Sequence, residues 1–350
     1  MRPANTIQVG LKDHSMMLVD CEGHQLKELS EYFSFFVPGH RYMPAFNRKV
    51  WDGNIRFFNQ MTRELNTGLY PHLKKFALDR MYPVQLVDND EYGHPELKNK
   101  IQHKSLVKYL DSLDAPFEIR DYQYDAISHG IENKRCLLLS PTGSGKSFII
   151  YNLLRWYYDN HDKNMLIIVP TTSLVEQLYK DFYEYGFDVE NEVHRIYSGK
   201  DKITDKRIII STWQSIYRLK FDWFEQFGAV FGDEVHLFKA KSLTGVMNKC
   251  KNAEYRFGTT GTLDGTETNK LVLEGLFGLT HKVIATKDLQ VRGTLAGLDI
   301  NVILLRYHND ICHLLKGKTY AEEVDYIVRH EKRNNFIKNL TLDLKGNTLV

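Results

Sequence analysis

The chain has 350 residues, room for about two or three domains, and its 43% hydrophobic and 12% aromatic content is sufficient for packed cores. Its 46 Lys and Arg residues nearly balance 44 Asp and Glu residues, so the net charge of +2 does not by itself indicate nucleic-acid binding. No apolar stretch approaches the roughly 18 residues of a membrane helix, Met1–Asn5 opens no signal peptide, and the four cysteines lack metal-site spacing. We therefore expect a cytoplasmic globular protein without a membrane partner.

In chain order, the first informative segment is residues 40–58, where cations alternate with aromatic residues. Cations neutralise phosphates and aromatic rings stack on bases, so the segment is a candidate nucleic-acid contact. The alternative is a small α/β domain whose core holds most of the aromatic residues, with a hairpin turn at residues 51–54. The candidate contacts are Arg41, Arg48, Lys49 and Arg56. A helix is expected at residues 71–80, and residues 84–116 are polar and irregular in pattern.

A phosphate-binding loop is predicted at residues 140–147, Ser-Pro-Thr-Gly-Ser-Gly-Lys-Ser. An apolar strand pattern precedes it and a helical pattern begins at Phe148, which is the context that this motif requires; a chance glycine-rich turn is the alternative. Glycines let backbone amides point at phosphates, the lysine reaches the outer phosphates and the last serine can bind Mg²⁺. The candidate ATP-binding residues are Thr142, Gly143, Ser144, Gly145, Lys146 and Ser147, although glycine is usual at position 140.

An acidic motif, Asp233-Glu-Val-His236, follows the apolar residues 227–232. The apolar run predicts a buried strand that ends at the edge where open α/β sheets bind ligands. Asp233 is then a candidate Mg²⁺ ligand beside Ser147, and Glu234 is a candidate general base for the attacking water. Alone, such a motif is more typical of a solvated loop, and it is the phosphate loop upstream that favours catalysis.

Further strands are predicted at residues 165–169, 207–210 and 255–258, each followed by small hydroxyl residues. Helical patterns alternate with these strands, which indicates a parallel sheet with flanking helices. The hydroxyl residues could serve only as helix N-caps, but three such strand ends beside an ATP site favour a further role.

As an ordered set, these motifs resemble those of superfamily-two helicases of the DExH type, over about residues 117–300. The resemblance implies a RecA-like motor domain that uses ATP and Mg²⁺. The catalytic residues that it implies are Lys146, Asp233, Glu234 and His236. It also implies that Thr260 and Thr262 couple the ATP site to the nucleic-acid track.

Two more sets of residues follow from the same resemblance. Ile119–Gln123 resembles the adenine-reading element, with Arg120 and Gln123 as its contacts, although Asp121 could simply start a helix. The segments after two of the strands resemble those that grip the sugar-phosphate backbone without reading its sequence. Their residues are Pro170, Thr171, Thr172, Thr212, Trp213 and Gln214.

Residues 15–110 and Thr286–Gly293 resemble the UvsW family of recombination helicases of T-even-type phages. That family remodels branched nucleic acids such as junctions, forks, displacement loops and RNA–DNA hybrids. The resemblance implies an accessory nucleic-acid-binding α/β domain at residues 1–110, a RecA-like motor domain at 111–300, and a linker with the start of a second, truncated RecA-like domain at 301–350.

Since the second domain supplies the arginine finger in that family, we expect a monomeric N-terminal portion with little turnover by itself. A non-catalytic, nucleotide-gated nucleic-acid-binding module and an RNA helicase remain alternative functions, because both would carry nearly the same motifs.

Overall fold

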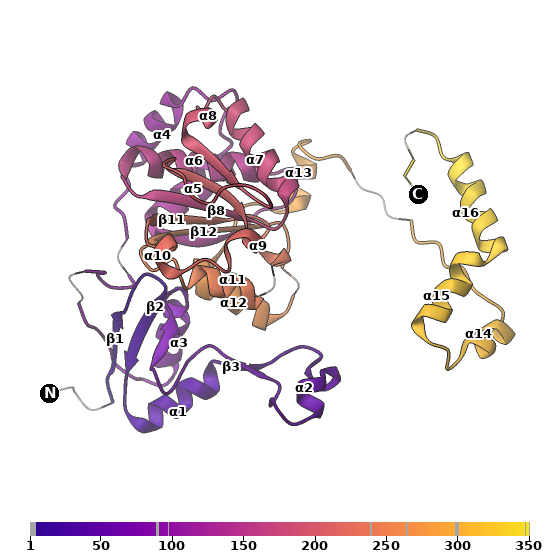
Figure 1. Ribbon diagram of the computed structural model, residues 1–350, viewed down its shortest axis with the longest axis horizontal. Coiled ribbons are helices and arrows are strands. Elements are labelled where there is room, and N and C mark those ends of the chain that lie inside the picture. The colour runs from indigo at the N-terminus through magenta and orange to yellow at the C-terminus, as the bar shows by residue number, and fades with distance from the viewer. Residues whose placement is uncertain are drawn as a thin grey trace. The chain divides into compact units, whose positions relative to one another are not determined.

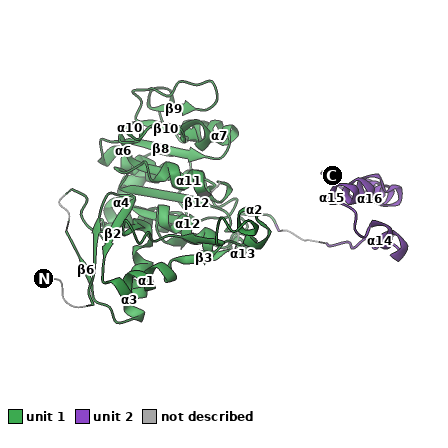
Figure 2. Cartoon of the chain, turned by 60° about the horizontal axis from the view of Figure 1, so that its bottom comes forward, with its two compact units in different colours: residues 1–296 green, residues 297–350 purple. Residues whose placement is uncertain are grey.

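The structure is a computed structural model that describes residues 5–88, 91–96, 98–238, 240–263, 265–297, 301–346 and 348–349. Residues 1–4, considered above for a signal peptide, lie outside the described residues. The chain forms two compact units, Met1–Ala296 and Gly297–Val350 (Figure 2). In the part of the chain that is described, no helix combines the length and the apolar character needed to span a membrane.

A seven-stranded parallel sheet forms the core of the first unit, in the order β13-β7-β12-β11-β8-β10-β9 (Figure 1). Its strands are β7 Arg135–Leu139, β8 Asn164–Val169, β9 Val193–Ile196, β10 Ile208–Thr212, β11 Phe227–Gly232, β12 Tyr255–Thr260 and β13 Thr280–Lys282. β11 and β12 are buried along their whole length, as strands covered by helices on both faces must be. The predicted α/β class with a parallel sheet and flanking helices is confirmed.

Helices cover both faces of this sheet. They are α4 His103–Ser112, α5 Asp121–Asn133, α6 Lys146–Asn160, α7 Thr172–Glu184, α8 Val189–Glu192, α9 Trp213–Ile216, α10 Phe221–Phe224, α11 Ala240–Met247, α12 Glu267–Phe277 and α13 Thr286–Val291. α5, α6 and α7 share one apolar core with Leu138 and Ile167, and α11 and α12 share another with Leu137 and Ile168. The neighbouring residues of each strand thus enter opposite cores, because side chains alternate across a sheet.

A four-stranded sheet in the order β5-β2-β1-β6 lies in the same unit. Its strands are β1 Ile7–Leu11, β2 Met16–Asp20, β5 Glu64–Asn66 and β6 Val84–Leu86, with helices α1 Gly23–Tyr32 and α3 Tyr70–Asp79 and the short helix η2 Thr67–Leu69. Phe33 and Phe76 pack with Val9 and Val19 in its core. α3 confirms the helix predicted at residues 71–80.

Residues 34–56 form an arm that extends from the four-stranded sheet and carries α2 Pro44–Asn47 at its far end (Figure 1). β3 Ser34–Phe36 pairs antiparallel with β4 Asn54–Arg56, and the connection holds η1 His40–Tyr42 as well as α2. The hairpin turn predicted at residues 51–54 is therefore wrong, because all of residues 37–53 join the two strands. The Trp51 indole instead donates to the Asn54 carbonyl at 2.8 Å and closes the end of the connection.

Buried polar contacts join the four-stranded sheet to the seven-stranded sheet. The buried Arg256 guanidinium of β12 donates to the Ser15 hydroxyl at 2.7 Å and to the Ala253 carbonyl at 2.9 Å. Gly68 lies so close to α12 that a Cβ there would be 2.1 Å from the Glu274 carbonyl oxygen. The two sheets consequently belong to one compact unit, whereas the boundary at residues 110/111 stays a prediction.

The second unit contains three described helices: α14 Asn309–Leu315, α15 Tyr320–Arg329 and α16 Glu331–Asp343. Thr319 caps α15 in a capping box with Glu322, in which the Thr319 amide and hydroxyl both donate to the Glu322 carboxylate. The expectation that residues 301–350 begin a second RecA-like domain is not tested by these helices and stays a prediction.

Candidate functional site

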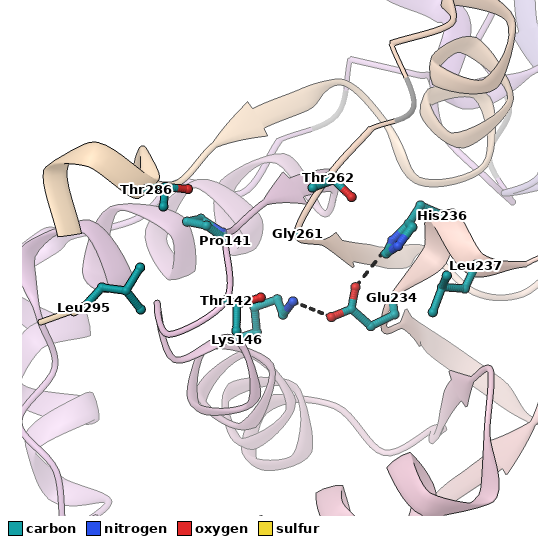
Figure 3. Close-up of a pocket in the computed structure, with 10 residues that line it drawn as sticks. All are labelled: Pro141, Thr142, Lys146, Glu234, His236, Leu237, Gly261, Thr262, Thr286 and Leu295. Carbon is teal, nitrogen blue, oxygen red and sulfur yellow. Dashed lines mark hydrogen bonds and ion pairs between the residues drawn. The ribbon is translucent and has the colours of Figure 1, made fainter. Parts of the chain in front are cut away.

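Three sequence motifs meet at one edge of the seven-stranded sheet. The phosphate loop follows β7, residues 260–262 lie where β12 ends, and Asp233 follows β11; these three strands are neighbours. Parallel strands bring their carboxyl ends to the same edge, where ligands of α/β sheets bind. A cavity of about 490 Å³ lies there, which we call the phosphate-loop cavity (Figure 3). Its lining residues are Pro141, Thr142, Lys146, Glu234, His236, Leu237, Gly261, Thr262, Thr286 and Leu295.

The phosphate loop has the backbone that the sequence requires. Gly143 and Gly145 have φ values of +81° and +80°, and a Cβ at Gly145 would lie 2.4 Å from Gln123 Nε2. α6 begins at Lys146, so its positive end faces the loop. The Ser140 and Ser144 hydroxyls share a 2.6 Å hydrogen bond, which shows how the loop accommodates serine in place of the usual first glycine.

Lys146 and Glu234 form an ion pair across the cavity (Figure 3). The other Glu234 carboxylate oxygen lies 3.4 Å from His236 Nδ1. Glu234 has a φ of +48°, a left-handed conformation that costs a side-chain-bearing residue roughly 1 kcal/mol and is typical of functional sites. The candidate base is thus held between the phosphate-binding lysine and the motif's histidine.

Thr260 connects His236 to the segment after β12. Its hydroxyl lies 2.7 Å from the Thr262 carbonyl oxygen and 2.7 Å from His236 Nδ1. A hydroxyl has one proton, and the carbonyl can only accept, so Thr260 donates to Thr262 and accepts from His236. His236 therefore carries a proton on Nδ1, and the hydrogen bond joins its ring to residues 260–262.

Asp233 lies almost completely buried behind this pair. Burial raises the pKa of its carboxyl above the usual range, against the effect of a 2.6 Å hydrogen bond that the Thr259 hydroxyl donates to Oδ1. The Glu234 amide also donates to Oδ1 at 2.9 Å, so both bonds that the structure describes use one oxygen. Thr259 was not predicted as a site residue. The sequence feature that could have identified it is a hydroxyl residue near the end of β12, the strand that pairs with β11 before Asp233.

Carboxylate and hydroxyl oxygens are the ligands that Mg²⁺ prefers, so Asp233 and Ser147 have suitable chemistry for this ion. The Ser147 hydroxyl, however, shares a 2.9 Å hydrogen bond with the Tyr185 hydroxyl. The Ser147 oxygen can bind the metal through a lone pair while its hydroxyl donates to Tyr185. No sequence signal pointed to Tyr185, which lies just after α7.

The raised pKa of Asp233 leads to a prediction about stability. Because a raised folded-state pKa favours the protonated form, stability conferred by that form is lost as pH rises from 3.8 through the folded value. Asp233→Asn keeps an oxygen for Thr259 and removes the buried charge. We expect the ligand-free variant to be more stable at about pH 8 by roughly 1 kcal/mol, with a smaller gain at about pH 5, and to lose Mg²⁺-dependent nucleotide binding. Thermal denaturation at both pH values measures this, and a lower melting temperature at about pH 8 would contradict it.

Gln123 does not lie in the cavity wall. Its Oε1 accepts from the Arg120 amide at 3.0 Å and its Nε2 donates to the Ser144 carbonyl at 2.9 Å. Gln123 therefore caps the start of α5, in agreement with the alternative that this segment simply begins a helix. It also forms a hydrogen bond with the phosphate loop. Arg120 is exposed and donates to the Tyr122 hydroxyl at 2.8 Å. Their adenine-reading role stays a prediction.

The candidate backbone-gripping residues gather at the same sheet edge, after β8 and β10. Gln214 Nε2 lies 3.3 Å from the Pro170 carbonyl oxygen and links the two segments. The Thr171 hydroxyl accepts from the Leu174 amide as the N-cap of α7, so the N-cap alternative describes its present contact. The Thr212 hydroxyl pairs with Ser215, and Thr172 and Gln214 are exposed. Trp213 is partly exposed.

The arm carries the candidate cations of the N-terminal region. Arg41, Arg48 and Lys49 are exposed, and within the described ranges none of them forms an ion pair. Arg56, in contrast, pairs with Asp52, which lowers the pKa of that carboxyl below its usual range. Arg56 is for this reason the weakest of the four candidates. Tyr42 is 89% exposed and available for stacking.

One wall of the phosphate-loop cavity contains no sequence motif and was not predicted. Leu295 lies against the loop, since a Cβ at Gly143 would be 2.7 Å from its Cδ1. Arg292, on the same segment, forms a 2.6 Å ion pair with Asp121 at the start of α5. The only signal was the family resemblance of Thr286–Gly293, which carries no chemical motif.

Comparisons with known proteins agree with this geometry. Residues 116–265 match the family described as type III restriction enzyme, res subunit, and residues 6–88 match the family DNA helicase UvsW, N-terminal. The chain is 34% identical over 354 residues to the ATP-dependent DNA helicase uvsW of Enterobacteria phage T4, covering 97% of this chain and 68% of that protein.

Solved structures lead to the same family. The structure titled "The crystal structure of T4 UvsW" shares 33% identity and a TM-score of 0.74 over 96% of this chain and 67% of that one. A crystal structure of the UvsW helicase from Bacteriophage T4 shares 32% identity and a TM-score of 0.73 over 79% of this chain and 99% of that one. The phosphate loop, the acidic motif and both family matches together show that this chain belongs to the UvsW family of superfamily-two, ATP-dependent DNA helicases.

Proposed function

We propose that this protein is an ATP-driven motor that remodels branched DNA, such as junctions, forks, displacement loops and RNA–DNA hybrids, in recombination, replication and repair. The observation that carries the proposal is the contact chain Lys146–Glu234–His236–Thr260 at the phosphate loop. It joins the candidate residues for ATP binding and hydrolysis to Thr260, the candidate coupling residue at the end of β12. A purely nucleotide-gated binding module would not need Glu234 at this place.

ATP enters the phosphate-loop cavity as the substrate. Backbone amides after Gly143 and the positive end of α6 would hold its phosphates, and Lys146 would pair with the outer ones. Ser147 and Asp233 would hold Mg²⁺, which would neutralise phosphate charge. Arg120 and Gln123 stay the candidates for reading the adenine base, and Gln123 would first have to release the Arg120 amide or the Ser144 carbonyl.

Glu234 would become active when the nucleotide arrives. In the ligand-free protein its carboxylate is paired with Lys146. Phosphates compete for the lysine, which would leave Glu234 with a free oxygen to orient and deprotonate water. The other Glu234 oxygen lies 3.4 Å from His236 Nδ1, whose proton goes to Thr260, so DNA contact near residues 260–262 would move the ring beside the base.

The cavity has no arginine among its described lining residues. Arginines at the transferred phosphate contribute roughly 10³ to 10⁵ in rate in related phosphoryl-transfer enzymes. We accordingly propose that this chain alone, as a monomer, binds ATP but hydrolyses it slowly. We also propose that residues 1–110 act as the accessory domain, residues 111–300 as the motor domain and residues 301–350 as a linker into a second domain.

The arm gives a prediction about DNA binding. Replacing both Arg48 and Lys49 with alanine is expected to weaken forked-DNA binding and to reduce the slope of log affinity against log salt by about 1 to 2, since each phosphate contact contributes about 0.9. Fluorescence anisotropy at several salt concentrations measures this. The matched control replaces Lys104 and Lys108, which are exposed on α4. If log affinity changes with log salt by the same slope in both variants, the arm is not part of the DNA-binding surface.

Affinity for matched substrates tests the proposed substrate class. A forked DNA, a linear duplex, an RNA–DNA hybrid and a duplex RNA of equal length are compared at one salt concentration. The proposal predicts that the fork binds most tightly and duplex RNA most weakly. Preference for duplex RNA would favour the RNA-helicase alternative.

A further inference from the structure

A second cavity, of about 330 Å³, lies at the junction between the two sheets of the first unit. Residues of η2 and α3 form one wall of this joint cavity, and the first residue of β7, Arg135, forms part of the other. The phosphate loop follows the opposite end of β7. The joint cavity is therefore at the other edge of the seven-stranded sheet from the phosphate-loop cavity.

Positive charge dominates the lining of the joint cavity. Lys74, Lys98 and Arg135 face one carboxylate, that of Glu96, which pairs with Lys74. Within the described part of the chain, Lys98 and Arg135 form no ion pair. The nearby carboxylate of Glu274 does not line the cavity. The lining therefore carries more cations than carboxylates, although Glu254 and Asp13 act on Arg135 from outside the cavity.

Arg135 is the more unusual of these two cations. Its guanidinium donates to the His14 carbonyl at 3.1 Å. Burial and the neighbouring Arg256 lower the pKa of Arg135 to about 9. Arg135 is half-buried and its described hydrogen bond goes to a neutral carbonyl, so an anion in the cavity would compensate for its lost hydration.

Glu274 cannot supply that anion, because its carboxylate is already satisfied. It lies 2.8 Å from His72 Nε2 and accepts from the Thr280 amide at 3.0 Å. The same contacts, with Lys270 nearby, hold the pKa of Glu274 below its usual value despite burial.

Thr67 provides an independent observation in the same wall. Its side chain is only 2% exposed, and its hydroxyl has no hydrogen-bond partner in the described structure. Buried hydroxyls are nearly always bonded, and an unbonded one is a position for an unseen acceptor or donor. Because Thr67 lines the cavity, rotation of its hydroxyl toward an oxyanion there would give it an acceptor, while the anion neutralises Lys98 and Arg135.

We propose that the joint cavity is a second anion site that binds a phosphate group, separate from the ATP site. Arginine and lysine are the side chains that bind phosphate oxygens, and Thr67 adds a neutral donor. The volume is at the lower end of small-molecule sites, roughly 300 to 1,000 Å³, so it fits a phosphate or pyrophosphate but no duplex. The phosphate belongs either to the end of a nucleic-acid strand or to a free small anion.

Pyrophosphate binding in a Lys146→Ala background tests the site, because this substitution silences the phosphate-loop cavity. Isothermal titration should show saturable binding that Lys74→Ala with Lys98→Ala weakens by about tenfold or more, as expected for losing two charged contacts. The matched control replaces Lys75 and Lys100, which are also exposed but do not line the cavity. Absent binding, or equal weakening in the control, would overturn the proposal.

Thr67→Val gives a second test that does not alter charge. Valine has the same shape without the unbonded hydroxyl, so we expect a higher melting temperature for the ligand-free protein and a smaller pyrophosphate-induced increase. If pyrophosphate raises the melting temperature of the variant as much as that of the parent protein, Thr67 does not bind the anion and the proposed site is wrong.

Two trinucleotides, one with a 5′-phosphate and one with a 5′-hydroxyl, distinguish the source of the phosphate. Tighter binding of the phosphorylated one supports the site with a strand end as its ligand. Binding of pyrophosphate alone supports it with a free anion. Because all these assays use the Lys146→Ala protein, their outcome does not depend on the proposed ATPase.

Discussion

Replacing Lys146 with alanine is expected to weaken Mg²⁺-ATP binding by roughly a hundredfold or more. The lysine would contribute charge-assisted hydrogen bonds to the outer phosphates, each worth about 1.5 to 3 kcal/mol, and alanine removes all of them. Titration with a fluorescent nucleotide measures the loss. Lys180→Ala is the matched control, because Lys180 is exposed on α7 and pairs only with Glu184 among the described residues. Unchanged nucleotide affinity in the Lys146 variant would show that the phosphate loop does not bind ATP.

Replacing Glu234 with glutamine is expected to leave nucleotide binding intact and to slow hydrolysis by about 10² to 10⁴, the range that general bases contribute. Glutamine keeps an oxygen beside Lys146 but cannot accept a proton from water. Nucleotide affinity should even rise slightly, since the lysine no longer has a charged partner to leave. Single-turnover hydrolysis with protein in excess over ATP registers rates this low.

The control for this substitution is Glu225→Gln, at an exposed position after α10. It removes the same charge away from the cavity and should leave the hydrolysis rate unchanged. Normal hydrolysis in the Glu234 variant would show that another group activates the water.

The strands of the seven-stranded sheet were predictable because their signals are local. The run at residues 227–232 coincides with β11, and the run at 165–169 lies within β8, since both strands are buried on two faces and are continuously apolar. The phosphate loop was predictable for a similar reason. Its glycines at positions 143 and 145 are required by local backbone geometry that no other residue adopts easily.

Features that depend on distant contacts were not predictable. The hairpin turn at residues 51–54 failed because β3 pairs with β4 across a long connection, whereas turn composition reports only on neighbouring residues. α4 was missed in the polar residues 84–116, because Leu106 and Leu110 are the only fully buried residues of this helix.

The structure also gave contacts in the site that sequence spacing could not indicate. Tyr185 bonds Ser147 and Thr259 bonds Asp233, each across 26 or more residues of chain. Gln123 was expected in the adenine site, but its amide is occupied by Arg120 and the phosphate loop. A motif identifies which residue types are present, and tertiary packing decides which partners they have.

The decisive measurement is ATP hydrolysis with and without forked DNA, made beside nucleotide and DNA binding at one salt concentration. The chain is expected to bind Mg²⁺-ATP and forked DNA with slow turnover, because the described lining of the cavity contains no arginine. Fast, DNA-stimulated turnover would contradict the requirement for an added arginine. Failure to bind nucleotide at all would contradict the assignment of the phosphate-loop cavity as the ATP site.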